Sequence, residues 1–433
     1  MKDNSYNNIA FSIASKGIAV IAYFGADILC ARILPMQDYA SWVYFASIKT
    51  MIAYIAYFGL NTSAKVLVAQ KTNEEERLKC LKASIKIRVI INLLFAALIT
   101  VFSQFLAEKL DGQKQYSGFS DIFWVMGLLV LFEAFFEFYK QLSYGLGDYK
   151  LLFQVTSIEF GSNIVLTFFF LLVWRNIFGV LWACIISGSM SVLVCAFLLN
   201  RNYVCKAKKL NKVEEMAIWK QLFKYAFPLL ACDIANLIAL ELDTSMIGLL
   251  SSKEQVVFYN IGKKLVSKAG HVNLAIAGGV MTSFAVINND NYTEQKKRFK
   301  KYMAINFIAA LGVCIGLLFF AYGGVGLIYG KEYIGAKTVI LLMVPYYCMF
   351  AISSFLALFL DFQNRTTFRS VVSIISTGLN LVLNLVYIPQ HGAIGAIGAT
   401  LISQMVYFVF VCLSSIKMWK SKKCIYNKIS ELN

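Results

Sequence analysis

The sequence predicts an all-α polytopic membrane protein, with about twelve transmembrane helices in two six-helix lobes. Hydrophobic residues make up 59% of the 433-residue chain and charged residues only 15%, whereas soluble proteins average about 25% charged. Apolar runs of about 20 residues, enough to cross a bilayer as a helix, recur throughout the chain. The longest polar connection, residues 200–221, falls in the middle of the chain with six such runs on either side.

The hydropathy pattern gives an approximate range for each span. The twelve ranges are 9–33, 40–64, 87–107, 122–144, 151–174, 177–199, 222–250, 256–286, 302–329, 336–360, 367–389 and 392–416. Counted from an inside N-terminus, the inner connections hold 29 Lys and Arg residues and the outer ones hold seven. Because positive residues are enriched in cytoplasmic loops, we expect both termini in the cytoplasm.

A shift of 216 residues brings the hydropathy pattern of the first half onto that of the second, and Asp27 then falls on Asp243. Six spans per half is an even number, so both halves start on the same side. This predicts a parallel repeat, with a pseudo-twofold axis along the membrane normal and a cleft between the lobes. The expected parts are an N-terminal lobe (1–200), a basic cytoplasmic linker (201–221), a C-terminal lobe (222–416) and a basic cytoplasmic tail (417–433).

The formal net charge of +17 is explained by the positive-inside rule and by anionic lipid, so no nucleic-acid partner is expected. The ten cysteines form no CxxC pair and there are only two histidines. These residues predict neither a metal site nor a bound cofactor. The sequence contains no GxxxxGK[ST] loop, so ATP binding is not expected.

The span at 256–286 combines an apolar composition with four cationic or titratable side chains. Lys264, Lys268 and His271 follow helical spacing and share one face, whereas Lys263 points about 100° away from Lys264. A lysine deep in a bilayer costs about 2.5–3.5 kcal/mol on insertion scales, so it should face water or a partner. The stripe is therefore either one wall of a cavity for an anion, or a set of lysines that snorkel or pair with carboxylates.

Two further lysines, Lys16 and Lys49, fall inside predicted spans of the first lobe. If both lobes line a central cleft, these lysines face Lys264 and Lys268 across it. For Lys16, snorkelling to the inner surface is the alternative.

A second set of charges consists of acids within the spans. It comprises Asp27, Glu133, Glu137, Glu159 and Asp243. Intramembrane acids can carry protons or sodium in coupled transport, and they can equally be counter-ions for lysines. Both readings stay open, and we hypothesise that Asp27, Glu133 or Asp243 links transport to an ion gradient.

The stretch 373–403 holds two asparagines four residues apart, then Pro389 and a Gly/Ala-rich segment that begins at Gly392. We expect Pro389 to end one helix and the small residues to let the next helix pack closely. With ARILPMQDYASW, YFGLNTSAK and GLGDYK earlier in the chain, this pattern resembles the multidrug/oligosaccharidyl-lipid/polysaccharide (MOP) exporter superfamily. Within it, the chain is most similar to the polysaccharide repeat-unit (O-antigen, Wzx-type) flippases.

This resemblance implies a flippase and not an enzyme. The cargo would be a polyprenyl-pyrophosphate-linked oligosaccharide, an O-antigen or similar repeat unit, moved from the inner to the outer leaflet of the bacterial inner membrane by alternating access. A proton or sodium gradient is the candidate energy source. The implied partners are the lipid-linked substrate, membrane lipids and other polysaccharide assembly proteins.

Two alternatives remain. A drug or organic-cation antiporter of the same superfamily predicts a cleft dominated by carboxylates, and the span lysines argue against it. A membrane glycan polymerase or ligase needs an outer catalytic loop, and the longest outer connection, about 107–121, is short.

Overall fold

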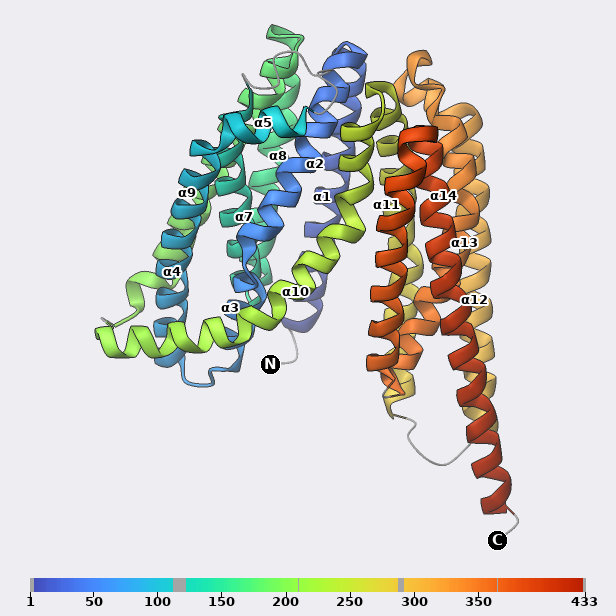
Figure 1. Cartoon of the computed structure of the whole chain (residues 1–433). Helices are drawn as coiled ribbons and strands as arrows, with labels where there is room; N and C mark the ends of the chain where they lie inside the picture. Colours follow the sequence, from blue (N-terminus) through green and yellow to red (C-terminus); the bar gives the residue numbers. More distant parts are fainter. Residues whose placement is uncertain (1–3, 112–121, 209, 287–291, 364, 431–433) are drawn as a thin grey trace. The chain divides into compact units, whose positions relative to one another are not determined.

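The computed structural model describes residues 4–111, 122–208, 210–286, 292–363 and 365–430. Every regular element in these ranges is a helix, which confirms the predicted all-α class (Figure 1). The chain divides into two compact units, Met1–Ser245 and Met246–Asn433. The lobe boundaries expected from the sequence stay a prediction.

The helices of unit 1 come first in the chain. They are α1 (Asn4–Ile33), α2 (Met36–Tyr57), α3 (Leu60–Gln70), α4 (Glu74–Val101), α5 (Ser103–Leu110), α7 (Met126–Leu146), α8 (Tyr149–Val173), α9 (Ile177–Asn202), the short 3-10 helix η1 (Val204–Lys206) and α10 (Lys212–Leu250). Helix α8 packs between α1 and α9, while α7 packs against α2, α3, α4 and α9. The apolar core of this unit includes Leu81, Phe138 and Leu222, all almost completely buried.

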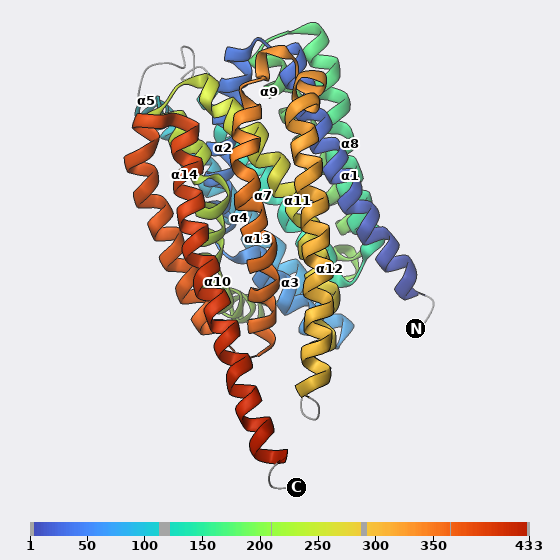
Figure 2. The same ribbon diagram turned by 90° about the vertical axis from the view of Figure 1, so that its right-hand side faces the viewer.

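Unit 2 holds the remaining helices. They are α11 (Lys253–Val286), α12 (Tyr292–Phe319), the π-helical turn η2 (Phe320–Tyr329), the 3-10 turn η3 (Lys331–Tyr333), α13 (Ala336–Phe362) and α14 (Thr366–Ser430). Within this unit α13 packs against α11, α12 and α14, so it is the central helix (Figure 2).

By length and composition, seven of the described helices could cross a membrane, or eight if the bent α2–α3 pair is one span. Helix α14 contains two such spans joined at a non-helical residue, Gly392. Helices α7, α10 and α11 are also long, at 21, 39 and 34 residues, but they carry charged side chains. Together these helices supply the twelve predicted crossings, and the chain is a multi-span membrane protein.

The predicted span 40–64 is wrong as a single helix, because the chain breaks after Tyr57 and α3 leaves at 44° to α2. Phe58 and Gly59 both adopt left-handed backbone angles, with φ of 51° and 66°. A Cβ on Gly59 would lie 2.1 Å from the Ala226 carbonyl oxygen, so only glycine allows α10 to pass this close. The YFGLNTSAK segment therefore encodes a bend in the second span.

The expectation that Pro389 ends a helix is also wrong, because the chain stays helical beyond it and reverses at Gly392. The backbone of Gly392 has φ of 56°, which L side chains rarely adopt, and a Cβ there would lie 2.8 Å from the Ser251 hydroxyl. The helix that follows begins with the Ala393 N–H donating to Gln255 Oε1 at 3.2 Å. The reversal thus needs glycine more than it needs proline.

Candidate functional site

An ion pair inside the spans of unit 1 joins α2 to α7. Lys49 Nζ lies 2.5 Å from Glu133 Oε2, and about a quarter of each side chain is exposed (22% and 24%). The Tyr57 hydroxyl donates a hydrogen bond to the other carboxylate oxygen of Glu133 at 3.4 Å. The structure thus brings together a predicted substrate-binding lysine and a predicted counter-ion.

Helices α8 and α9 add further polar groups near this pair. Glu159 and Cys184 lie within the electrostatic range of Lys49. Asn163 Nδ2 donates to Ser187 Oγ at 3.2 Å, which holds α8 and α9 together through side chains. One buried carboxylate oxygen of Glu159 has no hydrogen-bond partner in the described part of the chain.

The other acid on α7 is engaged locally. Glu137 forms an ion pair with Lys140, one turn further along α7. It also accepts a hydrogen bond from Gln141 Nε2 at 2.8 Å. Although Glu133 and Glu137 lie on one face of α7, they therefore serve different lysines.

Arg88 on α4 is completely buried, although its position in the sequence predicts a charge of an inner connection. Its guanidinium donates to the carbonyl oxygens of Ala56 at 3.0 Å, Tyr57 at 3.1 Å and Ala134 at 3.1 Å. The first two carbonyls are freed by the break after Tyr57, because the helical donors four residues ahead are lost there. Arg88 thus donates hydrogen bonds to carbonyl oxygens at the break between α2 and α3, beside the Lys49–Glu133 pair.

The two predicted residues of α1 lie in different surroundings. Lys16 is exposed, whereas Asp27 is 6% exposed and accepts a hydrogen bond from the Tyr39 hydroxyl at 2.9 Å. This hydrogen bond links α1 to the first turn of α2. The turn between the two helices lies at Pro35, within the ARILPMQDYASW segment. The structure does not bring Lys16 and Asp27 together.

Asp243 on α10 is half-buried. Near it, Glu241, which is not among the acids predicted from the sequence, accepts a hydrogen bond from Ser47 Oγ at 3.1 Å. The Ser47 and Ser245 hydroxyls lie 2.7 Å apart. These contacts hold α10 against α2 through polar groups.

The lysines of α11 lie in unit 2. Gly262 and Gly270 face α13, since a Cβ at these positions would come within 3 Å of Val339 and Phe350. Lys264 is two residues beyond Gly262, so its side chain is about 200° around the helix from that packed face. Lys268 follows one turn later, is half-buried and lies within the electrostatic range of Lys264.

The other two predicted residues of α11 flank this pair of lysines. Lys263 is half-buried and His271 is exposed. Because Lys263 precedes Lys264 by one position, it lies about 100° around the helix. The described residues contain no group of three or more His, Cys, Asp or Glu side chains that could hold a metal ion. The roles of all these residues stay predictions.

Residues 5–282, more than half of the chain, match the family described as "Polysaccharide biosynthesis protein". The chain belongs to this family. A relative from Methanocaldococcus jannaschii, described as an uncharacterized membrane protein, is 20% identical over 435 residues, which cover 94% of this chain and 83% of that protein.

The fold is similar to solved transporter structures. The Lipid II flippase MurJ in an inward closed conformation matches with a TM-score of 0.75 and 14% identity, covering 94% of this chain and 87% of that chain. An inward-facing multidrug resistance MATE family transporter of the MOP superfamily matches with a TM-score of 0.71 and 14% identity, covering 94% and 99%. The chain therefore has the fold of MOP-superfamily transporters, as its sequence motifs predicted.

Proposed function

We propose that this protein is a flippase for a polyprenyl-pyrophosphate-linked oligosaccharide, such as an O-antigen repeat unit for lipopolysaccharide. The cargo would pass from the inner to the outer leaflet of a bacterial inner membrane by alternating access, without catalysis by this chain. Membership of the polysaccharide biosynthesis family and a fold shared with a flippase support this proposal.

The observation that carries the proposal is the pair Lys264 and Lys268 on α11. Both lie on the face of the helix opposite to the one that packs against α13, and both are partly buried. Two ammonium groups one turn apart match the multiple negative charges of a pyrophosphate. The cost of placing two cations in a membrane helix is then offset whenever the cargo is bound.

The uneven distribution of Lys and Arg between the connections bears on which side of the membrane the two termini lie. The inner connections hold 29 Lys and Arg residues and the outer ones hold seven. We infer that both termini lie in the cytoplasm, on the side of the membrane where the sugars would be added to the carrier lipid. Other polysaccharide assembly proteins are the expected partners on either side of the transport step.

A drug or organic-cation antiporter is the second candidate. The similarity to MATE family transporters favours it, and Glu133 already neutralises Lys49, which leaves unit 1 less cationic than its sequence suggests. Such a protein would bind cations through acids such as Glu159. The two candidates differ in the sign of the charge that the protein transports.

Deletion of the gene followed by complementation tests the proposal. The variant is Lys264→Ala with Lys268→Ala, and the matched control is Lys300→Ala with Lys301→Ala, two exposed lysines of α12. We expect loss of surface glycan on deletion, recovery with wild type and with the control, and failure with the α11 double variant. Membrane levels of each protein are measured in parallel.

Two outcomes would contradict the proposal in different ways. If the α11 double variant restores surface glycan as well as wild type, the lysines have no role in binding cargo. If deletion leaves surface glycan intact but sensitises the cells to organic cations, the antiporter replaces the flippase.

A further inference from the structure

The first part of α10 carries apolar side chains on two faces. One face packs into unit 1, where Leu222 and Ala226 are fully buried and Trp219 Nε1 donates to the Ala83 carbonyl oxygen at 3.0 Å. The other face, here called the outer face of α10, follows helical spacing and is exposed. Its apolar residues are Val213 (80% exposed), Met216 (67%), Phe223 (36%) and Phe227 (73%). The exposed Lys220 lies on the same face, one turn after Met216.

A helix that is apolar on both faces needs a second apolar environment besides the protein core. Figure 1 shows the first part of α10 crossing the start of α4 at a steep angle, before the helix turns to run beside α2. Lys212, Lys220 and Lys224 are exposed on the same part of α10. An interfacial helix can bury such an apolar face while lysines on or beside it extend their ammonium groups to the lipid headgroups.

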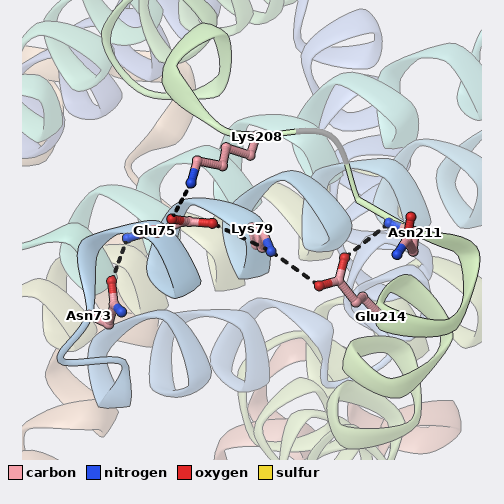
Figure 3. A network of polar contacts seen from close by, with 6 residues as sticks. All are labelled: Asn73, Glu75, Lys79, Lys208, Asn211 and Glu214. Carbon is pink, nitrogen blue, oxygen red and sulfur yellow. Dashed lines mark hydrogen bonds and ion pairs between the residues drawn. The ribbon is translucent and has the colours of Figure 1, made fainter.

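Ion pairs fix this helix to the start of α4 (Figure 3). Lys208, just before α10, donates to Glu75 at 2.8 Å. Lys79 lies 3.6 Å from Glu75 and 3.1 Å from Glu214, in the first turn of α10. We call these four residues the linker clasp: Glu75, Lys79, Lys208 and Glu214. It binds α4 to a residue just before α10 and to the first turn of α10.

A cavity of about 230 Å³ lies beside the linker clasp. It is lined by Lys82, Ala83 and Lys86 of α4, by Leu210, and by Glu215 of α10. One water needs only about 10–15 Å³ of such volume, so the cavity has room for a phosphate group. If the first part of α10 lies in the membrane interface, the cavity next to it lies at the depth of lipid headgroups.

The charges of the cavity favour an anion. Lys86 is neutralised by Glu215, whose carboxylate lies 2.7 Å from the ammonium group. Lys82 has no carboxylate partner among the described residues, so one positive charge is left uncompensated. A basic pocket at the end of a transmembrane helix is a suitable site for an acidic lipid headgroup.

We propose that this cavity binds the phosphate of an anionic lipid, with Lys82 as the principal contact, while the outer face of α10 packs among the acyl chains. Free phosphate offers the same chemistry but has no apolar part. The apolar outer face next to the cavity therefore favours the lipid. This inference concerns the annular lipid of unit 1 and does not depend on the transported cargo.

The test is lipid binding by native mass spectrometry of the full-length protein, titrated with dioleoylphosphatidylglycerol or with dioleoylphosphatidylcholine. Wild type should bind the first phosphatidylglycerol more tightly than phosphatidylcholine. Lys82→Gln should weaken the binding of phosphatidylglycerol about fivefold, which is the effect of one lysine near an anionic lipid. Lys82→Arg should retain the binding, and the matched control Lys300→Gln on α12 should bind like wild type.

Equal affinity of wild type and Lys82→Gln for phosphatidylglycerol would overturn the proposal, as would equal affinity for the two lipids. Inorganic phosphate at 10 mM identifies the source of the anion. If it fails to displace the lipid, the occupant is the lipid. If it displaces phosphatidylglycerol completely, and Met216→Gln with Phe227→Gln binds like wild type, the acyl chains contribute nothing and the lipid assignment is wrong.

Discussion

At the scale of single residues, the ion pair between Lys49 and Glu133 changes how the charges in the spans are understood. From the sequence, Lys49 is a candidate cargo ligand and Glu133 a candidate coupling acid or counter-ion. The structure places their charged atoms 2.5 Å apart. Each group then stabilises the charge of the other, and a proton or a competing anion would have to break this contact first.

We expect Glu133→Gln to lower the stability of the protein, because it leaves the Lys49 ammonium without its counter-charge. A fully buried pair loses about 3–5 kcal/mol when one partner is removed, and exposure of about a quarter of each side chain reduces this to about 1–3 kcal/mol. Thermal unfolding in detergent measures the change. The double variant Lys49→Met with Glu133→Leu should recover most of the loss, and a failure to recover would show that the pair is not the cause.

Arg88 shows what a sequence without a structure conceals. It stands at the start of an apolar run, where a basic residue ordinarily marks the end of a span. Its guanidinium binds the carbonyl oxygens of Ala56, Tyr57 and Ala134, which are 32, 31 and 46 positions away in the sequence. Only the three-dimensional course of α2, α3 and α7 brings these carbonyls together, so hydropathy could not reveal it.

At the scale of elements, the break between α2 and α3 depends on Gly59. We expect Gly59→Ala to destabilise unit 1, because the new methyl would meet the Ala226 carbonyl and a positive φ. The loss should exceed about 1 kcal/mol, measured as a lower melting temperature in detergent.

The matched control is Gly161→Ala on α8, where a Cβ meets no atom within 4 Å. It should leave stability unchanged or raise it by up to about 1 kcal/mol, because alanine favours helix over glycine. Equal melting temperatures for the two variants would contradict a special role of Gly59.

The linker clasp predicts a dependence on pH at the start of α10. The Asn211 backbone N–H and the Lys79 ammonium lower the pKa of Glu214 below its ordinary 4.5. A carboxylate whose pKa is lowered in the folded state stabilises the linker clasp at pH values above its ordinary pKa. This stabilisation is lost as the pH falls through the folded-state pKa. Hydrogen exchange of residues 210–216 should therefore be slow and unchanged from pH 7 to about 5, after correction for the intrinsic rate, and faster near pH 3.

Glu214→Gln provides the comparison for this measurement. It should show fast exchange in the same segment at every pH, whereas exchange in α8 should match wild type. A wild-type segment that is equally mobile at pH 7 and pH 3 would exclude the clasp as the restraint.

The elements could largely be predicted from the sequence, and the exceptions share one cause. The twelve spans were found because length and apolar composition are properties of each segment alone. The bend at Gly59 and the reversal at Gly392 are set by close approach to α10 and to Ser251. Such contacts come from distant parts of the chain, so the nearby proline, a local signal, gave the wrong helix end.

At the scale of the whole molecule, we hypothesise that an acid within the spans links transport to an ion gradient. We expect that at least one of Asp27→Asn, Glu133→Gln and Asp243→Asn changes the dependence of transport on a proton or sodium gradient, because a neutral amide cannot bind and release the cation as a carboxylate does. Transport is measured in vesicles with an imposed gradient of either ion. Unchanged ion dependence in all three variants would mean that these acids are structural counter-ions.

The family and the fold of the whole chain could be predicted from its motifs and its even number of spans, whereas the cargo site could not. Its position depends on which helix faces meet water in each state, and polarity alone ranked Lys16 and Lys49 beside Lys264. The structure separates them, because Lys16 is exposed on α1 and Lys49 is paired with Glu133. The role of Lys264 and Lys268 in binding an anionic cargo remains a proposal.

The most direct test is flipping by the purified protein in lipid vesicles loaded with a fluorescent polyprenyl-pyrophosphate oligosaccharide. A membrane-impermeant quencher reports how much of the cargo reaches the outer leaflet with time. We predict faster flipping than in protein-free vesicles, and a loss of at least about tenfold for Lys264→Ala with Lys268→Ala. Flipping no faster than in protein-free vesicles, together with uptake of an organic cation by the same vesicles, would contradict the account.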